Sequence, residues 1–192
     1  TSGNFITIKC VSTDTGVVPT PLTHYYIAQK AFDNIYMATY VTSEPSVGEL
    51  RYIFRGQYNV IPNGPAPSNN NGSSGAIESS DVFGHSNGQT SSKYFGNEQE
   101  RNLTVKGATG SGVGVFMAFG NRESSSGGPF YHDIENQGDG AGSDQEIYNY
   151  MNSGHNQTEA NRVNVLHGPY AYCFTTGGTP AVPDMSFIAN LG

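Results

Sequence analysis

Residues 49–55 read Glu-Leu-Arg-Tyr-Ile-Phe-Arg, and this stretch indicates the class of fold. Large apolar residues alternate with charged ones, a pattern typical of a half-buried β-strand. Period-2 geometry gives one face three core residues, Leu50, Tyr52 and Phe54. The opposite face carries Arg51 and Arg55, with Glu49 and Ile53. We therefore expect a strand with one core face and one face that presents two cations.

Six other segments have strand character, because β-branched and aromatic residues cluster in them between Gly, Pro and Asn. They are residues 5–11, 24–29, 35–41, 103–105, 113–119 and 162–175. Polar stretches at 56–92 and 121–155 interrupt them, and helical periodicity is scarce. Many short strands with turn signals between them predict an all-β fold, a large antiparallel β-sandwich.

Composition supports one β-domain and excludes several classes of partner. The chain has 192 residues, which suits a single domain, and its 12 Tyr and 10 Phe can build a core. Only 13% of residues are charged, and the net charge is −7 with nine Lys and Arg, which argues against nucleic-acid binding. The longest apolar run, residues 113–119, is far short of the roughly 20 residues that cross a bilayer. We expect neither nucleic acid nor a membrane as a partner.

Features that report on the compartment are few. Cys10 and Cys173 permit one disulfide at most, and the sequence leaves open whether they are paired or free. Three Asn-x-Ser/Thr triplets, at Asn71, Asn102 and Asn156, are compatible with a secreted glycoprotein. The sequence begins at Thr1 without a signal peptide, so we expect any such peptide to have been removed or to lie upstream.

Metal and nucleophile motifs give little support for those chemistries. None of the five histidines has a His-x-His or His-Glu-x-x-His spacing. Three acidic residues, Asp139, Asp144 and Glu146, occupy a glycine-rich stretch that lacks an EF-hand pattern, and a solvated acidic loop is the favoured interpretation. Neither cysteine has an activating context, and there is no Gly-x-Ser-x-Gly motif. We expect no metal and no cofactor.

Two other polar regions can carry chemistry. Residues 148–159 (YNYMNSGHNQTE) hold two tyrosines, several amides and His155, which could bind sugar hydroxyls and accept a proton near neutral pH. The alternative is a polar turn with a structural histidine. Lys93 lies beside aromatic residues in 91–95 (SSKYF), and with Arg51 and Arg55 it could bind a small anionic group. Equally, each cation could pair with an ordinary surface carboxylate.

Several strings in this sequence resemble one known family. They are 35–40 (IYMATY), 44–51 (EPSVGELR), 121–130 (NRESSSGGPF), 148–159 and 166–170 (LHGPY). In this order they are similar to the catalytic domain of rhamnogalacturonan lyases of polysaccharide lyase family 4, closest to the fungal type. The resemblance implies a β-sandwich related to the galactose-mutarotase fold. It also implies β-elimination between rhamnose and O4 of galacturonate in pectin, which leaves an unsaturated uronate.

The resemblance carries expectations about organisation. Residues 1–192 would form a single catalytic β-sandwich domain that lacks its first strands. Fibronectin-III-like and carbohydrate-binding-like domains that follow in the family would be absent. We expect a secreted, extracellular monomer that acts on rhamnogalacturonan I without a cofactor.

The resemblance also assigns site residues. His155 matches the catalytic base, and Lys93 matches the catalytic lysine. The matches to substrate-binding residues are Arg51, Arg55, Tyr148 and Tyr150. Tyr150 is the candidate that donates a proton to the leaving oxygen, whereas His167 is interpreted as structural.

Two alternatives stay open at this point. A non-catalytic carbohydrate-binding β-sandwich would keep the fold and cleft without turnover. An aldose epimerase on a related fold would use a His/Glu pair on a free sugar. The clustered cations favour a uronate, and a binding module has no need of a base, so the lyase is the leading hypothesis.

Overall fold

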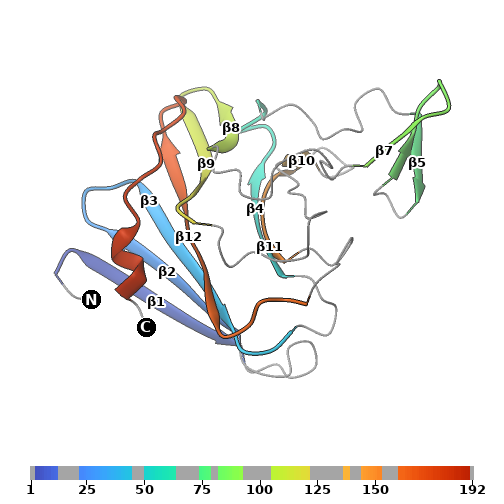
Figure 1. Ribbon diagram of the computed structural model, residues 1–192. Coiled ribbons are helices and arrows are strands. Elements are labelled where there is room, and N and C mark those ends of the chain that lie inside the picture. The colour runs from blue at the N-terminus through green and yellow to red at the C-terminus, as the bar shows by residue number, and fades with distance from the viewer. Residues whose placement is uncertain are drawn as a thin grey trace.

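The computed structural model describes residues 3–12, 22–44, 50–63, 74–78, 82–92, 105–121, 136–138, 144–152 and 160–190. Within them the chain is almost entirely antiparallel β-structure, so the predicted all-β sandwich is confirmed. Figure 1 shows one large sheet facing a smaller one, with a third small sheet set apart.

The large sheet has six strands in the order β1-β2-β3-β12-β9-β8. In chain order they are β1 (Phe5–Ser12), β2 (Leu22–Gln29), β3 (Asn34–Val41), β8 (Lys106–Gly110), β9 (Val113–Phe119) and β12 (Val165–Thr175). The longest strand, β12, pairs with β3 on one side and with β9 on the other. A strand from the C-terminal part of the chain therefore lies beside one from the N-terminal part.

The second layer is a three-stranded sheet in the order β10-β11-β4. Its strands are β4 (Leu50–Gln57), β10 (Asn136–Gly138) and β11 (Asp144–Asn152). The third sheet consists of β5 (Gly75–Glu78), β6 (Val82–Gly84) and β7 (Thr90–Ser92). It lies at the far right of Figure 1.

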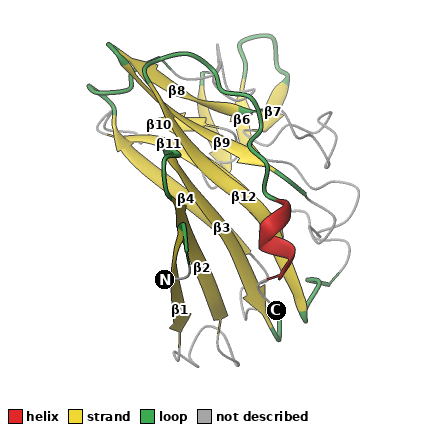
Figure 2. Ribbon diagram, turned by 90° about the vertical axis from the view of Figure 1, so that its left-hand side faces the viewer, coloured by secondary structure: helices red, strands yellow, loops and turns green. Residues whose placement is uncertain are grey.

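Two apolar clusters cover the two faces of the large sheet. Between the layers, Met37, Met117 and Tyr170 from the large sheet belong to one buried cluster with Ile147 and Met151 of β11. On the outer face, the 3-10 helix η1 (Ser186–Asn190) brings Ile188 into a second cluster (Figure 2). The second layer is therefore held by its inner face, which leaves its other face for a site.

Several sequence predictions are corrected by this topology. The strand expected at 103–105 is wrong for Val105, because the strand begins at Lys106. Residues 121–155 were interpreted as a polar interruption, yet residues 144–152 form β11. Cys10 is exposed on β1 and Cys173 is buried on β12, and both thiols are free, which settles the disulfide question. No helix in the described ranges is long and apolar enough to span a bilayer.

A backbone bridge ties the two layers together beyond β4. The amide of Asn63 donates to the Thr109 carbonyl at 2.9 Å, and the amide of Thr109 donates to the Asn63 carbonyl at 2.7 Å. Next to this bridge, a Cβ placed on Gly110 would lie 1.8 Å from the Val60 carbonyl oxygen. Only glycine lets the two backbones approach this closely.

We predict that Gly110→Ala lowers the free energy of unfolding by about 1–3 kcal/mol, since the backbone must shift to admit the methyl group. Urea denaturation of the variant beside wild type measures this change. Gly178→Ala is the matched control, because a Cβ there meets nothing within 4 Å. Equal unfolding midpoints for the two variants would show that the close approach is not required.

Candidate active site

The outer face of the second layer is built from two paired strands. Antiparallel register places Arg55 opposite Glu146, Ile53 opposite Tyr148 and Arg51 opposite Tyr150. Directly opposed residues share a face, and so do residues two apart along a strand. These six side chains therefore form one surface, here named the cationic face. Leu50, Phe54 and Ile147 point the other way, into the core.

Hydrogen bonds connect the side chains of the cationic face in pairs. Nη1 of Arg51 donates to the hydroxyl of Tyr150 at 3.1 Å, and the guanidinium lies 5.9 Å from the centre of that ring. Nε of Arg55 donates to Oε1 of Glu146 at 2.6 Å. The hydroxyl of Tyr148 donates to the other carboxylate oxygen, Oε2 of Glu146. The rings of Tyr148 and Tyr150 stack with centres 5.8 Å apart.

The side chains of the cationic face differ in their exposure to solvent. Tyr150, Tyr148 and Glu146 are all buried, whereas the Arg55 side chain is 56% exposed. Burial raises the pKa of Tyr148, and its hydrogen bond to the Glu146 carboxylate raises it further. Tyr148 therefore stays a protonated phenol at neutral pH.

The net formal charge of the cationic face is complementary to a single carboxylate on a ligand. Two guanidinium groups stand against a single carboxylate, so Arg51, Arg55 and Glu146 together carry a formal charge of +1. Arg51 donates to a neutral phenol, whereas Arg55 donates to the Glu146 carboxylate. In these two bonds, a carboxylate faces the guanidinium of Arg55 and a phenol faces that of Arg51. A guanidinium group can stabilise negative charge that develops on a bound acid.

The predicted site residues fall into two sets. Four of them, Arg51, Arg55, Tyr148 and Tyr150, come together on the cationic face. The other two, His155 and Lys93, lie outside the described residues. In sequence, β11 ends three residues before His155, and β7 ends directly before Lys93.

The alternation of side chains along β11 is interrupted after Tyr150. Period-2 spacing alone would put Tyr148, Tyr150 and Asn152 on the same face. The ring stacking agrees for the two tyrosines. A register shift follows Tyr150, however, and Asn152 pairs with Leu50. The regular alternation therefore ends at Tyr150, because the ladder contains an irregularity there.

Sequence reasoning missed the role of Glu146. The interpretation of Asp139, Asp144 and Glu146 as a solvated acidic loop is wrong for Glu146, which is buried and hydrogen-bonded in β11. Asp139 lies outside the described residues. The alternation Glu146-x-Tyr148-x-Tyr150 is the signal that could have revealed this carboxylate as a member of the tyrosine face.

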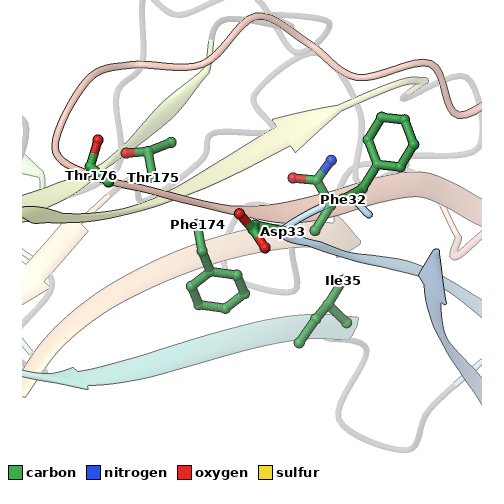
Figure 3. Close-up of a pocket in the computed structure, with 7 residues that line it drawn as sticks. Phe32, Asp33, Ile35, Phe174, Thr175 and Thr176 are labelled. Carbon is green, nitrogen blue, oxygen red and sulfur yellow. The ribbon is translucent and has the colours of Figure 1, made fainter. Parts of the chain in front are cut away.

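A cavity elsewhere in the molecule does not match the predicted chemistry. Its volume is about 480 Å³, and it lies where β3 begins and β12 ends (Figure 3). Its described lining is Phe32, Asp33, Asn34, Ile35, Phe174, Thr175 and Thr176. These residues include a carboxylate and no cation, so they offer nothing to pair with a uronate. None of them was predicted as a site residue.

Two histidines are buried in structural positions. Nε2 of His167 lies 2.9 Å from the carbonyl oxygen of Arg162, in agreement with its interpretation as structural. Nδ1 of His24 lies 2.8 Å from the Thr39 hydroxyl, and its ring stacks on Tyr52 at 5.1 Å. Burial lowers the pKa of His24 from 6.5 to about 4.

This burial predicts a loss of stability in acid. Because the folded pKa of His24 lies below its unfolded value, the stabilisation is present above pH 6.5 and is lost as the pH falls through 4. A shift of this size corresponds to about 3 kcal/mol. Urea denaturation at pH 7 and pH 4 should show a smaller acid loss for His24→Gln than for wild type. An NMR titration midpoint near 6.5 for His24 would contradict the prediction.

Comparison with known proteins points to one group. Residues 1–192 match a family model described as "Rhamnogalacturonan lyase B, N-terminal". A relative from Aspergillus fumigatus, "Probable rhamnogalacturonate lyase A", is 47% identical over 99% of this chain and 34% of its own length. "Rhamnogalacturonate lyase A" is 44% identical in Emericella nidulans and 43% in Aspergillus aculeatus. These two matches cover 100% and 99% of this chain, and 35% and 34% of the relatives. The chain thus spans about a third of the length of the relatives it matches.

Proposed function

From the fact that this chain belongs to the rhamnogalacturonan lyase B N-terminal family, we propose that it contributes the substrate-handling face of a polysaccharide lyase. The relatives are named rhamnogalacturonate lyases. The proposed substrate is the backbone of rhamnogalacturonan I, a pectic polysaccharide. The proposed reaction cleaves the rhamnose-(1→4)-galacturonate bond by β-elimination.

The reaction has a specific electrostatic requirement. A base removes the C5 proton of galacturonate, the electrons form the C4–C5 double bond, and O4 leaves with a proton. The adjacent carboxylate is already negative, so the enolate-like state needs a cation beside it. In galacturonate, O4 and the C5 hydrogen are axial on opposite ring faces. The base and the proton donor can therefore act from opposite sides.

The observation that carries this proposal is the placement of two arginines and two phenols on one face of the second layer. Arg51 has the charge to neutralise the uronate carboxylate, and it already orients the Tyr150 hydroxyl at 3.1 Å. In that bond the hydroxyl is the acceptor, and Tyr150 keeps its phenolic proton. Tyr150 is accordingly the proposed donor to O4. Arg55 and Tyr148 complete the proposed binding surface.

The remaining roles are proposals that rest on the family resemblance. His155 would remove the C5 proton, and Lys93 would share the neutralisation of the carboxylate with Arg51. Residues 1–192 would act as one catalytic β-sandwich domain. Since pectin belongs to the plant cell wall, we propose that the protein is secreted and meets its substrate outside the cell.

The test is an assay of the full gene product that contains these residues. Incubation with rhamnogalacturonan I should raise the ultraviolet absorbance of the unsaturated uronate. Carboxyl-reduced rhamnogalacturonan is the matched control substrate, and it should give no product because it lacks the acidifying carboxylate. Binding of the intact polysaccharide without any unsaturated product would favour a carbohydrate-binding module instead.

A further inference from the structure

Glu146 joins the two halves of the cationic face and has no role in the function proposed so far. Its side chain is 8% exposed, and each carboxylate oxygen accepts a separate hydrogen bond. Oε1 accepts from Arg55, and Oε2 accepts from Tyr148. We propose that Glu146 is a positioning residue, which fixes Tyr148 and Arg55 in the orientations that bind the sugar. This inference rests on the proposed function of the cationic face.

The strand pairing explains why a glutamate at this position can reach both partners. Glu146 lies directly opposite Arg55 in the ladder and two residues before Tyr148 on the same strand. Both partners therefore share its face of the sheet. A buried carboxylate is costly unless it is paired and hydrogen-bonded. Here one oxygen is matched by a guanidinium and the other by a phenol, so both oxygens are satisfied.

The direction of the bond to Tyr148 has a chemical consequence. A carboxylate can only accept, so the phenolic proton of Tyr148 points at Glu146. With its one proton engaged by Glu146, the Tyr148 hydroxyl acts as an acceptor towards any other partner. We infer that Tyr148 accepts a hydrogen bond from a sugar hydroxyl. Tyr150 differs, because its oxygen accepts from Arg51. In these two bonds the stacked tyrosines have opposite roles, Tyr148 as donor and Tyr150 as acceptor.

Glu146 also determines how charge is distributed over the face. Its carboxylate is bound at 2.6 Å to Nε of Arg55, which fixes the plane of that guanidinium. The pairing offsets the charge of Arg55, whereas Arg51 makes a separate bond to Tyr150. A neutral residue at 146 would release both partners from this geometry.

Glu146→Gln tests the positioning role with little change in size. An amide keeps one acceptor oxygen, but its nitrogen cannot accept a bond from Arg55 or Tyr148. We expect kcat/KM on rhamnogalacturonan I to fall about 10- to 100-fold, the scale of loss for a misplaced binding group. Glu44→Gln is the matched control. Glu44 accepts a bond from the Asn161 amide outside the cationic face, so its replacement should leave kcat/KM unchanged.

A double-mutant cycle separates positioning from a general structural role. If Glu146 acts through Tyr148, Tyr148→Phe should lower kcat/KM, and adding Glu146→Gln should cost much less than it costs in wild type. Additive losses, or a loss that follows a lowered unfolding midpoint in urea, would overturn the inference. So would a wild-type kcat/KM for Glu146→Gln.

Calorimetric titration with a rhamnogalacturonan oligosaccharide supplies a readout that does not depend on turnover. Glu146→Gln should weaken the Kd about 10-fold, whereas Glu44→Gln should not. If wild type binds the oligosaccharide but releases no unsaturated uronate, the lyase proposal fails while the positioning inference is still tested by the Kd. An unchanged Kd for Glu146→Gln, or no binding by wild type, would overturn the inference.

Discussion

Replacing His155 by alanine is expected to lower kcat on rhamnogalacturonan I by about 10²- to 10⁴-fold, the usual contribution of a positioned general base. The C5 hydrogen of a uronate is a weak acid, and water is a poor substitute for an imidazole held beside it. Substrate binding should be largely retained, because the proposed binding groups, Arg51, Arg55, Tyr148 and Tyr150, are unchanged. The loss should therefore be found in kcat and not in KM.

The pH dependence of the reaction gives this prediction a second readout. A histidine base must be neutral, so the activity of wild type should fall in acid around the ordinary histidine pKa of about 6.5. His85→Ala is the matched control. His85 lies in the turn after β6, where its backbone amide donates to the Gln89 carbonyl, and no role in the site is proposed for it. Substantial turnover by His155→Ala, with the acid limb intact, would remove His155 as the base.

Replacing Arg51 by alanine is expected to lower kcat/KM by about 10²- to 10³-fold, as measured when one group that stabilises developing charge is removed. Two effects combine in this variant. The enolate-like state loses the cation proposed to stabilise it, and the Tyr150 hydroxyl loses the donor that orients it at 3.1 Å. Steady-state kinetics with rhamnogalacturonan I should show that kcat falls as well as binding.

Arg51→Lys separates charge from geometry. A lysine keeps the positive charge but lacks the planar fork that can contact Tyr150 and a carboxylate together, so only part of the activity should return. Lys9→Ala is the control for loss of one positive charge, since Lys9 is exposed on β1 in the other sheet. If Arg51→Ala and Lys9→Ala behave alike, the carboxylate is neutralised elsewhere, and Lys93 becomes the group to replace.

The sequence predicted β4 well because that strand is half buried. Alternation puts Leu50, Tyr52 and Phe54 in or against the core, and it exposes Arg51 and Arg55, as the structure shows. Residues 113–119 were also predicted with the observed bounds of β9. In both segments the apolar side chains that the core requires are themselves the signal.

The strands that the sequence failed to predict lack such a signal. Strand β8 has the sequence KGATG, and its two glycines read as a turn. Gly107 is required there because a Cβ would lie 2.1 Å from the Val115 carbonyl oxygen of the neighbouring strand. Strand β11 reads as polar because its outer face carries Glu146 and two phenols. Their burial depends on partners from β4 that are about 90 residues away or more.

By itself, the sequence determined the all-β class, the cations on one face of β4 and the family, because local alternation and short motifs encode these features. Only the tertiary structure decided that β11 pairs with β4, in the register that places Arg51 opposite Tyr150 and Arg55 opposite Glu146. That register depends on the burial of Ile147 and Met151 against a sheet assembled from both ends of the chain. A carboxylate such as Glu146 becomes part of a site only when such packing removes it from water and supplies its two donors.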